Sequence, residues 1–192
     1  MKILLHCCCA PCSAAILEWM LQNGWQPTLY YFNPNIFPEE EYLIRKNECT
    51  KYAQKLDIEI IDGDYDHTEW LEEMCGLEDA PERGARCLRC FQMRLNATAR
   101  LAHERGFSTF TTTLASSRWK NLDQINQAGH AAAALFPSVE FCDRNWRKGG
   151  LQERRNALLK ENGFYNQLYC GCEFSMKTST ATAAETEVRQ QI

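Results

Sequence analysis

Four cysteines lie close together near the start of the chain, directly after a short apolar run. The run, Ile3-Leu4-Leu5, has the length and composition of a strand buried in the middle of a parallel sheet. Open α/β sheets build their ligand sites at the carboxyl ends of such strands. Neighbouring side chains on an extended strand point to opposite faces, which disfavours disulfides between them. The group therefore indicates a site for a thiophilic metal, which would combine ligands from elsewhere with some of Cys7, Cys8, Cys9 and Cys12.

The composition is that of a globular protein with an unusual number of thiols. The chain of 192 residues is expected to form one domain, and it has no run of the roughly 20 apolar residues that a spanning helix needs. The apolar run at its start is too short for a signal peptide, so we expect a cytoplasmic protein without a membrane partner. Reducing conditions there disfavour structural disulfides, and the eleven cysteines are an odd number. Such cysteine usage indicates metal binding or redox catalysis.

Strand patterns alternate with amphipathic helix patterns along the chain. We predict strands at 3–5, 28–32, 58–61, 107–114 and 139–141, and helices at 13–24 (capped by Ser13), 38–56, around Trp70, 91–104, 122–135 and 151–161. This alternation predicts an α/β fold with a parallel sheet. Residues 1–176 are expected to form this single domain, and residues 177–192, which lack apolar periodicity, a disordered tail.

A second thiol pair, Cys87 and Cys90, has the spacing of a ligand pair at the start of a helix, where amide groups stabilise thiolates. With two cysteines of the first group it would supply four sulfur ligands, which suit a structural zinc or an iron–sulfur cluster equally well. A thioredoxin-like redox pair is the other interpretation. Cys49 and Cys75 stand alone in helix patterns and are expected to be small core residues.

Cys170 and Cys172 form a different kind of pair, separated by one glycine. Such a pair can close a strained, easily reduced disulfide and relay two electrons, or it can supply further metal ligands. His6, at the end of the first predicted strand, is either a satisfied polar group or a residue near the metal or substrate.

Positive residues gather in two groups, although the net charge of −4 gives no general signal for nucleic acid. Clustered Arg and Lys can contact phosphates, and aromatic faces can stack on unpaired bases, but such clusters are as often solvated helix faces. The first group comprises Arg83, Arg86, Arg89, Arg94, Arg100 and Arg105, and the second comprises Arg144, Arg147, Lys148, Arg154 and Arg155 with Trp146.

Four motifs in this order resemble the QueH-type epoxyqueuosine reductases over residues 3 to about 176. They are Leu5-His6-x-Cys8-Cys9-Ala10-Pro11-Cys12-Ser13, Arg86-Cys87-x-x-Cys90-Phe91-x-Met93-Arg94-Leu95, Thr111-Thr112-Thr113-Leu114 and Gln167-x-Tyr169-Cys170-Gly171-Cys172. The resemblance implies a HUP-type, three-layer sheet. It also implies reduction of the epoxide of epoxyqueuosine in tRNA to the alkene of queuosine, the final step in making that wobble base, without cobalamin.

The resemblance also implies the roles of individual cysteines. Cys8, Cys9, Cys87 and Cys90 match the residues that hold a [4Fe–4S] cluster in the family, and Cys12 matches a position at an additional iron. Cys170 and Cys172 match its redox-active pair, and Cys7 is an extra thiol. Substrate contacts are expected from His6, Arg144, Trp146, Arg147 and Lys148, and the electrons come from an unidentified donor.

The hypothesis is a two-electron, two-proton reduction in which iron acts as a Lewis acid and the Cys170–Cys172 pair ends as a disulfide. A zinc-stabilised nucleic-acid-binding module without catalysis is the main alternative. A sulfur transferase or nucleotide-activating enzyme on the same kind of sheet is the other. This second alternative requires a glycine-rich phosphate loop after the first strand, where the chain has Cys8-Cys9-Ala10-Pro11-Cys12 instead.

Overall fold

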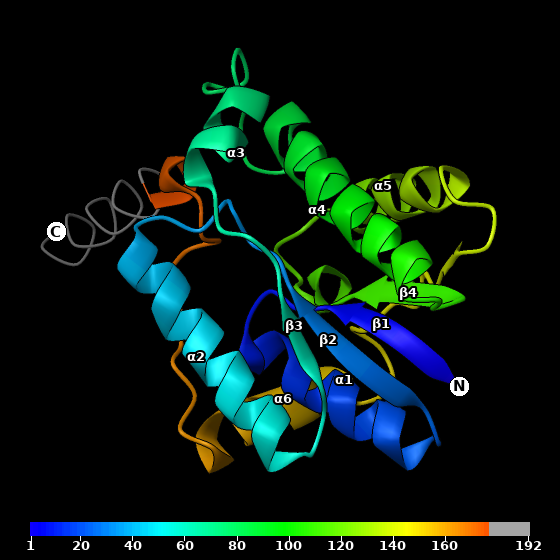
Figure 1. Ribbon diagram of the computed structural model, residues 1–192. Helices are drawn as coiled ribbons and strands as arrows, with labels where there is room; N and C mark the ends of the chain where they lie inside the picture. The colour runs from blue at the N-terminus through cyan, green and yellow to red at the C-terminus, as the bar shows by residue number, and fades with distance from the viewer. Residues whose placement is uncertain (177–192) are drawn as a thin grey trace, which may run out of the picture.

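A computed structural model of the chain describes residues 1–176 (Figure 1). The predicted tail at 177–192 lies outside the described residues. The strands of the described domain are β1 (Lys2–His6), β2 (Gln26–Tyr31), β3 (Ile60–Asp62), β4 (Thr109–Thr112) and β5 (Glu140–Phe141). Its helices are α1 (Ala10–Gln22), α2 (Glu39–Lys55), α3 (His67–Glu73), α4 (Ala85–Glu104), α5 (Leu122–Ala134) and α6 (Leu151–Glu161), and a 3₁₀ turn, η1 (Thr113–Ser116), follows β4.

The five strands form one parallel sheet in the order β3-β2-β1-β4-β5. β1 is central and pairs with β2 and β4, with Leu5 opposite Leu29 on one side and Thr111 on the other. The chain builds outward from β1 in one direction through β3 and then returns to β1 to add β4 and β5 on the other side. The strand order therefore reverses between β1 and β4, and open α/β sheets bind ligands at the carboxyl ends of the strands at such a point.

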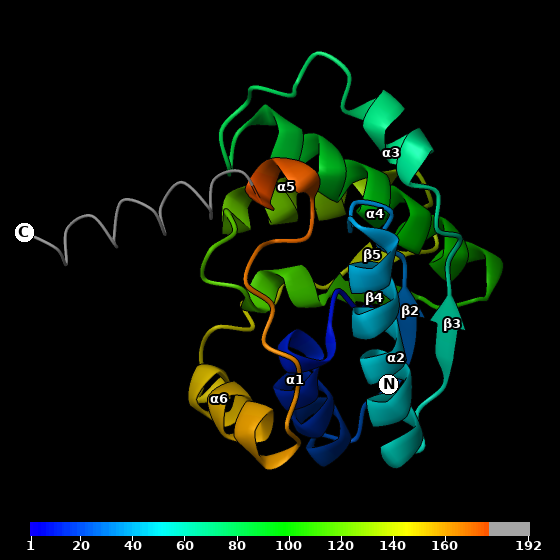
Figure 2. The ribbon, with the colours of Figure 1, turned by 90° about the vertical axis from the view of Figure 1, so that its left-hand side faces the viewer.

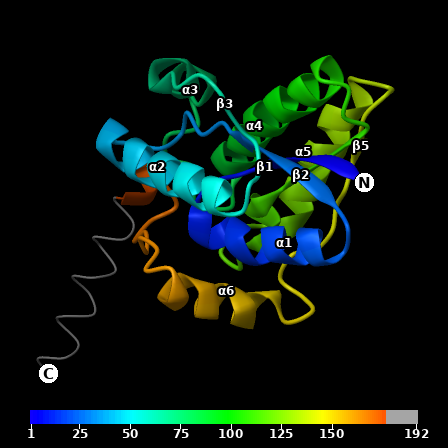
Figure 3. The ribbon, with the colours of Figure 1, turned by 60° about the horizontal axis from the view of Figure 1, so that its bottom comes forward.

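Helices cover both faces of the sheet, so the fold has three layers (Figures 1 and 3). α1, α2 and α6 pack on one face, and α4 and α5 pack together on the other. The parallel sheet flanked by helices confirms the predicted α/β class, since strands covered on both faces need the continuous apolar runs that the sequence shows. Ile3, Leu4 and Leu5 are fully buried at the centre of the core.

Two helix starts differ from the sequence prediction, and both changes move cysteines. α1 begins at Ala10, not after Ser13, because Pro11 fits the first turn of a helix. Ser13 therefore lies inside the helix and its hydroxyl donates to the Cys9 carbonyl at 3.0 Å. α4 begins at Ala85, not near Phe91, with Gly84 at its N-cap, so its first two turns contain both cysteines of the second pair.

The predicted strand 107–114 is also shorter than expected. β4 ends at Thr112, where its hydroxyl accepts from the Leu114 N–H at 3.1 Å and starts the η1 turn. This turn carries the chain away from the sheet edge and brings Thr113 over the end of β1. None of the helices in residues 1–176 has the length and apolar character needed to cross a bilayer.

Candidate metal centre and redox site

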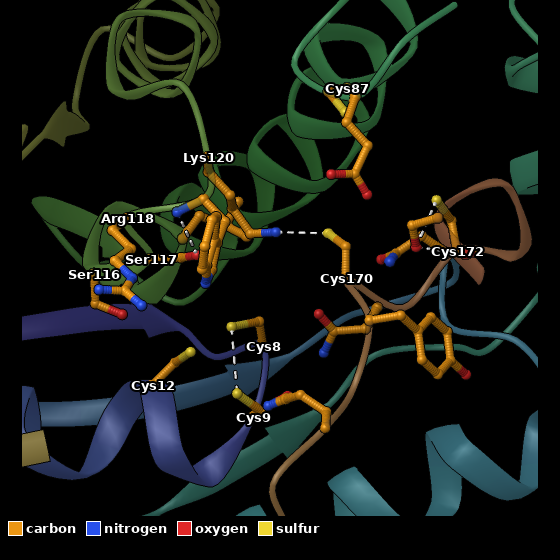
Figure 4. Close-up of a pocket in the computed structure, with 18 of the residues that line it drawn as sticks. Cys8, Cys9, Cys12, Cys87, Ser116, Ser117, Arg118, Lys120, Cys170 and Cys172 are labelled. Carbon is orange, nitrogen blue, oxygen red and sulfur yellow. Dashed lines mark hydrogen bonds between the residues drawn. The ribbon is translucent and has the colours of Figure 1, made fainter. Parts of the chain in front are cut away.

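A pocket of about 830 Å³ opens at the carboxyl edge of the sheet, at the point where the strand order reverses. Its walls come from the β1–α1 loop, the start of α4, the segment after η1 and the residues after α6. Pockets of several hundred Å³ hold drug-sized ligands, so this one has room for a modified nucleoside. The cysteines that line it are labelled in Figure 4: Cys8, Cys9, Cys12, Cys87, Cys170 and Cys172.

Three thiols of the β1–α1 segment form the tightest group. The sulfurs of Cys8, Cys9 and Cys12 all lie within 4.8 Å of one another, and no other such group of possible metal ligands occurs in residues 1–176. Cys9 occupies the N-cap position of α1 and Cys12 lies in its first turn, so the start of the helix brings these side chains close to Cys8. The thiols at the end of the first strand therefore form a group that could hold a metal ion, and soft thiolate ligands suit zinc, copper(I) or iron–sulfur centres.

Thr113 fixes the position of Cys8. Its hydroxyl accepts from the Cys8 N–H at 3.0 Å and donates to the Cys8 sulfur at 3.2 Å. Hydrogen bonds from Cys12 and Cys9 hold the pKa of Cys8 well below its usual value, whereas burial raises the pKa of Cys9. A thiolate at Cys8 is the form that ligates metals.

The second pair is less closely joined to this group. Cys87 lines the pocket, and its sulfur accepts from the Arg83 N–H at 3.2 Å, while burial raises its pKa to about 11. Cys90 follows one helical turn later and packs against Trp70 and Met74 in a small second core. The structure thus brings together Cys8, Cys9 and Cys12, and it places Cys87 and Cys90 outside that close group.

Residues 165–176, which we call the strap, run from the end of α6 past α1 toward α3 and α4 (Figure 2). Arg45 on α2 donates to the carbonyls of Cys170 at 3.2 Å and Tyr169 at 3.3 Å, and the Phe37 N–H donates to the Gly171 carbonyl at 2.9 Å. These contacts are made by main-chain atoms, so they hold the Cys170–Cys172 segment in place independently of its two thiol side chains.

Gly171 is required between the two cysteines of the strap. Its φ of +130° lies in a region that residues with a Cβ rarely adopt. A Cβ there would also meet Asn35, Ile36 and Arg45 at 3.2 Å. Further along the strap, the Glu173 carboxylate lies 2.8 Å from His67 Nε2 on α3. This contact anchors the end of the strap to α3.

Both strap cysteines are free thiols with separate partners. Lys120 Nζ donates to the Cys170 sulfur at 2.7 Å, and the Cys172 sulfur donates to the Ser175 hydroxyl at 3.5 Å. Figure 4 shows the two side chains pointing to different sides. The pair is therefore held apart, in a reduced arrangement.

His6 and Trp146, two of the expected substrate contacts, are fully buried in the structure. His6 Nε2 lies 3.1 Å from the Phe32 carbonyl, which can only accept, so Nε2 carries the proton and Nδ1 accepts from the Thr112 hydroxyl at 2.8 Å. Burial lowers its pKa to about 3, so the ring is neutral at physiological pH. Trp146 Nε1 donates to the Thr111 hydroxyl at 3.2 Å. Both side chains occupy satisfied positions in the core.

The three charged members of that set also lie away from the pocket lining in the described residues. The Arg144 guanidinium stacks on Trp19, 3.9 Å from the ring centroid, and Lys148 is exposed. Arg147 donates to the Lys120 carbonyl at 2.8 Å, so it supports a pocket residue from behind.

Two arginines of the first basic group are buried structural residues. Arg86 donates to the carbonyls of Leu77, Glu78 and Ala80, and it thereby holds the loop before α4. Arg94 donates to the Asn33 side chain, which in turn donates to the Cys7 carbonyl at 2.9 Å. These two side chains are committed to the protein itself and are not free to contact phosphates.

The segment Arg118-Trp119-Lys120 carries no sequence motif that marks it as part of the site. It forms one wall of the pocket, with Trp119 exposed over 66% of its surface and the Arg118 guanidinium 4.8 Å from its ring centroid. Arg83 Nε donates to the Trp119 carbonyl at 2.8 Å. The position of this segment in the chain could have indicated its place in the pocket wall, because it comes shortly after β4 and the η1 turn, and β4 pairs with β1 and ends at the same edge of the sheet.

The remaining cysteines lie outside the thiol group. Cys7 and Cys49 are buried with their sulfurs 3.4 Å apart, so Cys49 is a core residue as predicted. Cys75 is exposed just after α3, because that helix ends at Glu73, and the prediction of a core position for it was wrong.

The motifs and this geometry agree with the comparison to known proteins. A family model described as "Epoxyqueuosine reductase QueH" matches residues 3–178. The chain belongs to this family. It is 48% identical over 191 residues to the epoxyqueuosine reductase QueH of Histophilus somni, and that alignment covers 100% of this chain and 78% of the relative. The corresponding protein of Haemophilus influenzae is 47% identical over 191 residues, with the same coverage. That of Thermotoga maritima is 35% identical over 177 residues, covering 91% of this chain and 90% of the relative.

Membership of this family confirms the resemblance seen in the four motifs. The family consists of reductases, so the chain is an oxidoreductase. It argues against the non-catalytic zinc module. The β1–α1 loop also carries Cys7-Cys8-Cys9 where nucleotide-binding sheets have glycines, which argues against nucleotide chemistry.

Proposed function

We propose that the chain is a cytoplasmic enzyme that reduces the epoxide of epoxyqueuosine to the alkene of queuosine at the wobble position of tRNA, the final step of queuosine biosynthesis. The observation that carries the proposal is a single pocket in which the thiol group faces the strap cysteines, in a chain of this family. The proposed cofactors are a [4Fe–4S] cluster and an additional iron, without cobalamin.

The chemistry of the donors fits such a centre. Cys8, Cys9, Cys87 and Cys90 would hold the cluster and Cys12 the additional iron. Support comes from the close grouping of Cys8, Cys9 and Cys12 and from Cys87, which lines the same pocket from α4. When bound, iron supplies a Lewis acid for the epoxide oxygen and a route for electrons.

The strap cysteines would provide the two electrons. In the proposed step the S–H bonds of Cys170 and Cys172 break and an S–S bond forms. Two electrons and two protons pass to the epoxide, both C–O bonds break, the C=C bond forms and the oxygen leaves as water. An external electron donor then returns the disulfide to two thiols.

The exposed wall of the pocket suits an unpaired base and its phosphates. Trp119 offers an open aromatic face, and Arg118 and Arg155 supply positive charge at the same opening. Stacking on an aromatic side chain with phosphate contacts is how proteins bind single-stranded RNA loops. We therefore assign the anticodon loop to this wall. The roles expected for His6, Arg144, Trp146, Arg147 and Lys148 are then supporting ones.

The test begins with anaerobic purification and measurement of iron and sulfide per chain. Broad absorption near about 400 nm indicates iron–sulfur, whereas zinc is colourless. Turnover of an anticodon stem-loop that contains epoxyqueuosine is then followed by nucleoside mass spectrometry with excess chemical reductant. Cys170→Ser is expected to keep its iron and lose turnover, and Cys75→Ser, which changes an exposed cysteine outside the pocket lining, is expected to keep both. A colourless zinc protein, or full turnover by iron-loaded Cys170→Ser, contradicts the proposal.

A further inference from the structure

Lys120 is the one side chain that contacts a strap sulfur from across the pocket in the described residues. Its Nζ donates to the Cys170 sulfur at 2.7 Å, and the two residues lie 50 positions apart in the sequence. A contact between an ammonium and a sulfur at this distance is a charge-assisted hydrogen bond, which is stronger than a neutral one.

The structure fixes Lys120 at this place from several sides. Its N–H donates to the Ser117 carbonyl at 3.2 Å, and its own carbonyl accepts from Arg147 at 2.8 Å. The next residue, Asn121, caps α5, and the ring of Phe91 lies 6.0 Å from the ammonium. Hydrogen bonds on both sides of Lys120 therefore hold its backbone, and its side chain reaches Cys170 across the pocket.

We propose that Lys120 is a positioning residue that holds Cys170 away from Cys172 in the reduced enzyme and releases it when the disulfide forms. This inference rests on the redox role given to the pair in the proposed function. Cys172 has its own partner in Ser175, so each thiol is bonded separately before the reaction. Formation of the S–S bond requires the Cys170 sulfur to leave Lys120.

The contact has a defined energetic consequence. A thiol or thiolate sulfur accepts a hydrogen bond from an ammonium more strongly than a disulfide sulfur does, so Lys120 stabilises the reduced pair relative to the disulfide. Stabilising the reduced form makes a dithiol couple more oxidising, as in the strongest thiol oxidants. Lys120 therefore raises the reduction potential of the pair and lets an external donor re-reduce the disulfide easily.

Other charged and titratable groups near this contact act on it more weakly. Burial lowers the pKa of Lys120, but the charge of Cys170 and its hydrogen bond raise this pKa by more. The net effect is a raised pKa, so the ammonium stays protonated. The neighbouring groups that interact with the pair are Cys8, Cys87, Cys172, Arg45 and Arg94. Arg45 contacts Cys170 through its main-chain carbonyl and not through its sulfur, so this contact is expected in both redox states.

The test is a redox titration of the iron-loaded full chain in dithiothreitol buffers of known poise. Free thiols are alkylated, and trypsin releases residues 161–177, which contain Cys170 and Cys172 and no other cysteine. Lys120→Met is expected to raise the disulfide-to-dithiol ratio about tenfold at a fixed buffer potential. This corresponds to a reduction potential of the Cys170–Cys172 pair that is lower by about 30 mV. Lys120→Arg keeps a cationic donor and is expected to stay closer to the wild-type ratio.

Controls separate this inference from the proposed function. Lys51→Met removes an exposed lysine of α2 outside the thiol pocket and is expected to leave the potential unchanged. Lys120→Gln provides a second neutral variant, and thermal unfolding checks that each variant is folded. A wild-type chain whose peptide never forms the disulfide overturns both this inference and the redox role of the pair. A normal disulfide with an unchanged potential in Lys120→Met and Lys120→Gln overturns this inference alone.

Discussion

The guanidinium of Arg45 donates to the main-chain carbonyl of Cys170 at 3.2 Å, and so ties the strap to α2. The same guanidinium forms a buried ion pair with Glu41, one turn earlier on the helix, at 2.6 Å. Glu41 also accepts from the Tyr165 hydroxyl at 2.8 Å. One buried arginine thus contacts both Glu41 on α2 and the strap at Cys170.

Arg45→Met is expected to lower the free energy of unfolding by about 3–5 kcal/mol, because it leaves Glu41 as a buried, uncompensated charge. Thermal and denaturant unfolding measure this loss. The double variant Glu41→Leu with Arg45→Met removes both charges and is expected to recover most of the stability. Limited proteolysis should nevertheless cleave the strap of the double variant faster than that of the wild type, since the Cys170 and Tyr169 carbonyls have lost Arg45 as their donor. A protected strap in that variant would show that Arg45 does not hold it.

Thr113→Val tests the support of Cys8. Valine keeps the shape of threonine but loses both hydrogen bonds to Cys8, so we expect iron to be bound about 10- to 100-fold more weakly. The rate of iron loss to a chelator under anaerobic conditions is the measurement.

Thr111→Val is the matched control, because Thr111 is equally buried and lies two residues earlier. Its hydroxyl donates to the Cys142 carbonyl at 2.7 Å and has no contact with the thiol group. It is expected to lose stability by about 1–3 kcal/mol and to release iron at the wild-type rate. Equal iron loss from both variants would mean that Thr113 acts through general stability alone.

Trp119→Ala tests the assignment of the anticodon loop to the exposed wall. Loss of one stacked base is expected to weaken binding of an anticodon stem-loop by about 1–3 kcal/mol. Trp119→Phe should retain part of this energy, and unfolding should be unchanged because the ring is 66% exposed. Leu135→Ala removes a similarly exposed apolar side chain, 61% exposed, away from the pocket and serves as control.

The salt dependence of anticodon stem-loop binding distinguishes a contribution from base stacking from one made by phosphate contacts. Trp119→Ala should leave the slope of log K against log salt unchanged, while Arg118→Gln should reduce its magnitude by about 0.7 for one single-strand phosphate contact. Arg144→Gln and Lys148→Gln give the same slope measurement for two residues that the sequence predicts to contact the substrate. An RNA affinity that is unaffected by both Trp119→Ala and Arg118→Gln would place the RNA on another surface.

Much of the architecture could be predicted because it depends on local patterns. A buried apolar run followed by turn residues specifies a central parallel strand, and thiols placed directly after it must lie at the carboxyl edge of the sheet. Cys8, Cys9 and Cys12 form a close group for this reason, since they are neighbours in sequence as well as in space. The boundary errors at α1 and α4 arose where a proline and a glycine start a helix earlier than its apolar periodicity indicates.

The sequence by itself determined the α/β class, the family and the thiols at the end of the first strand, because each of these is written in short stretches of neighbouring residues. Only the tertiary structure decided which side chains meet across the pocket. Lys120 and Cys170 are 50 residues apart, and Arg45 and Cys170 are 125 apart. Their contacts depend on the strand order and on the path of the strap, which no local pattern encodes. Burial likewise placed Trp146 and His6 in the core and left Trp119 exposed, because burial depends on how the layers pack and not on residue type alone.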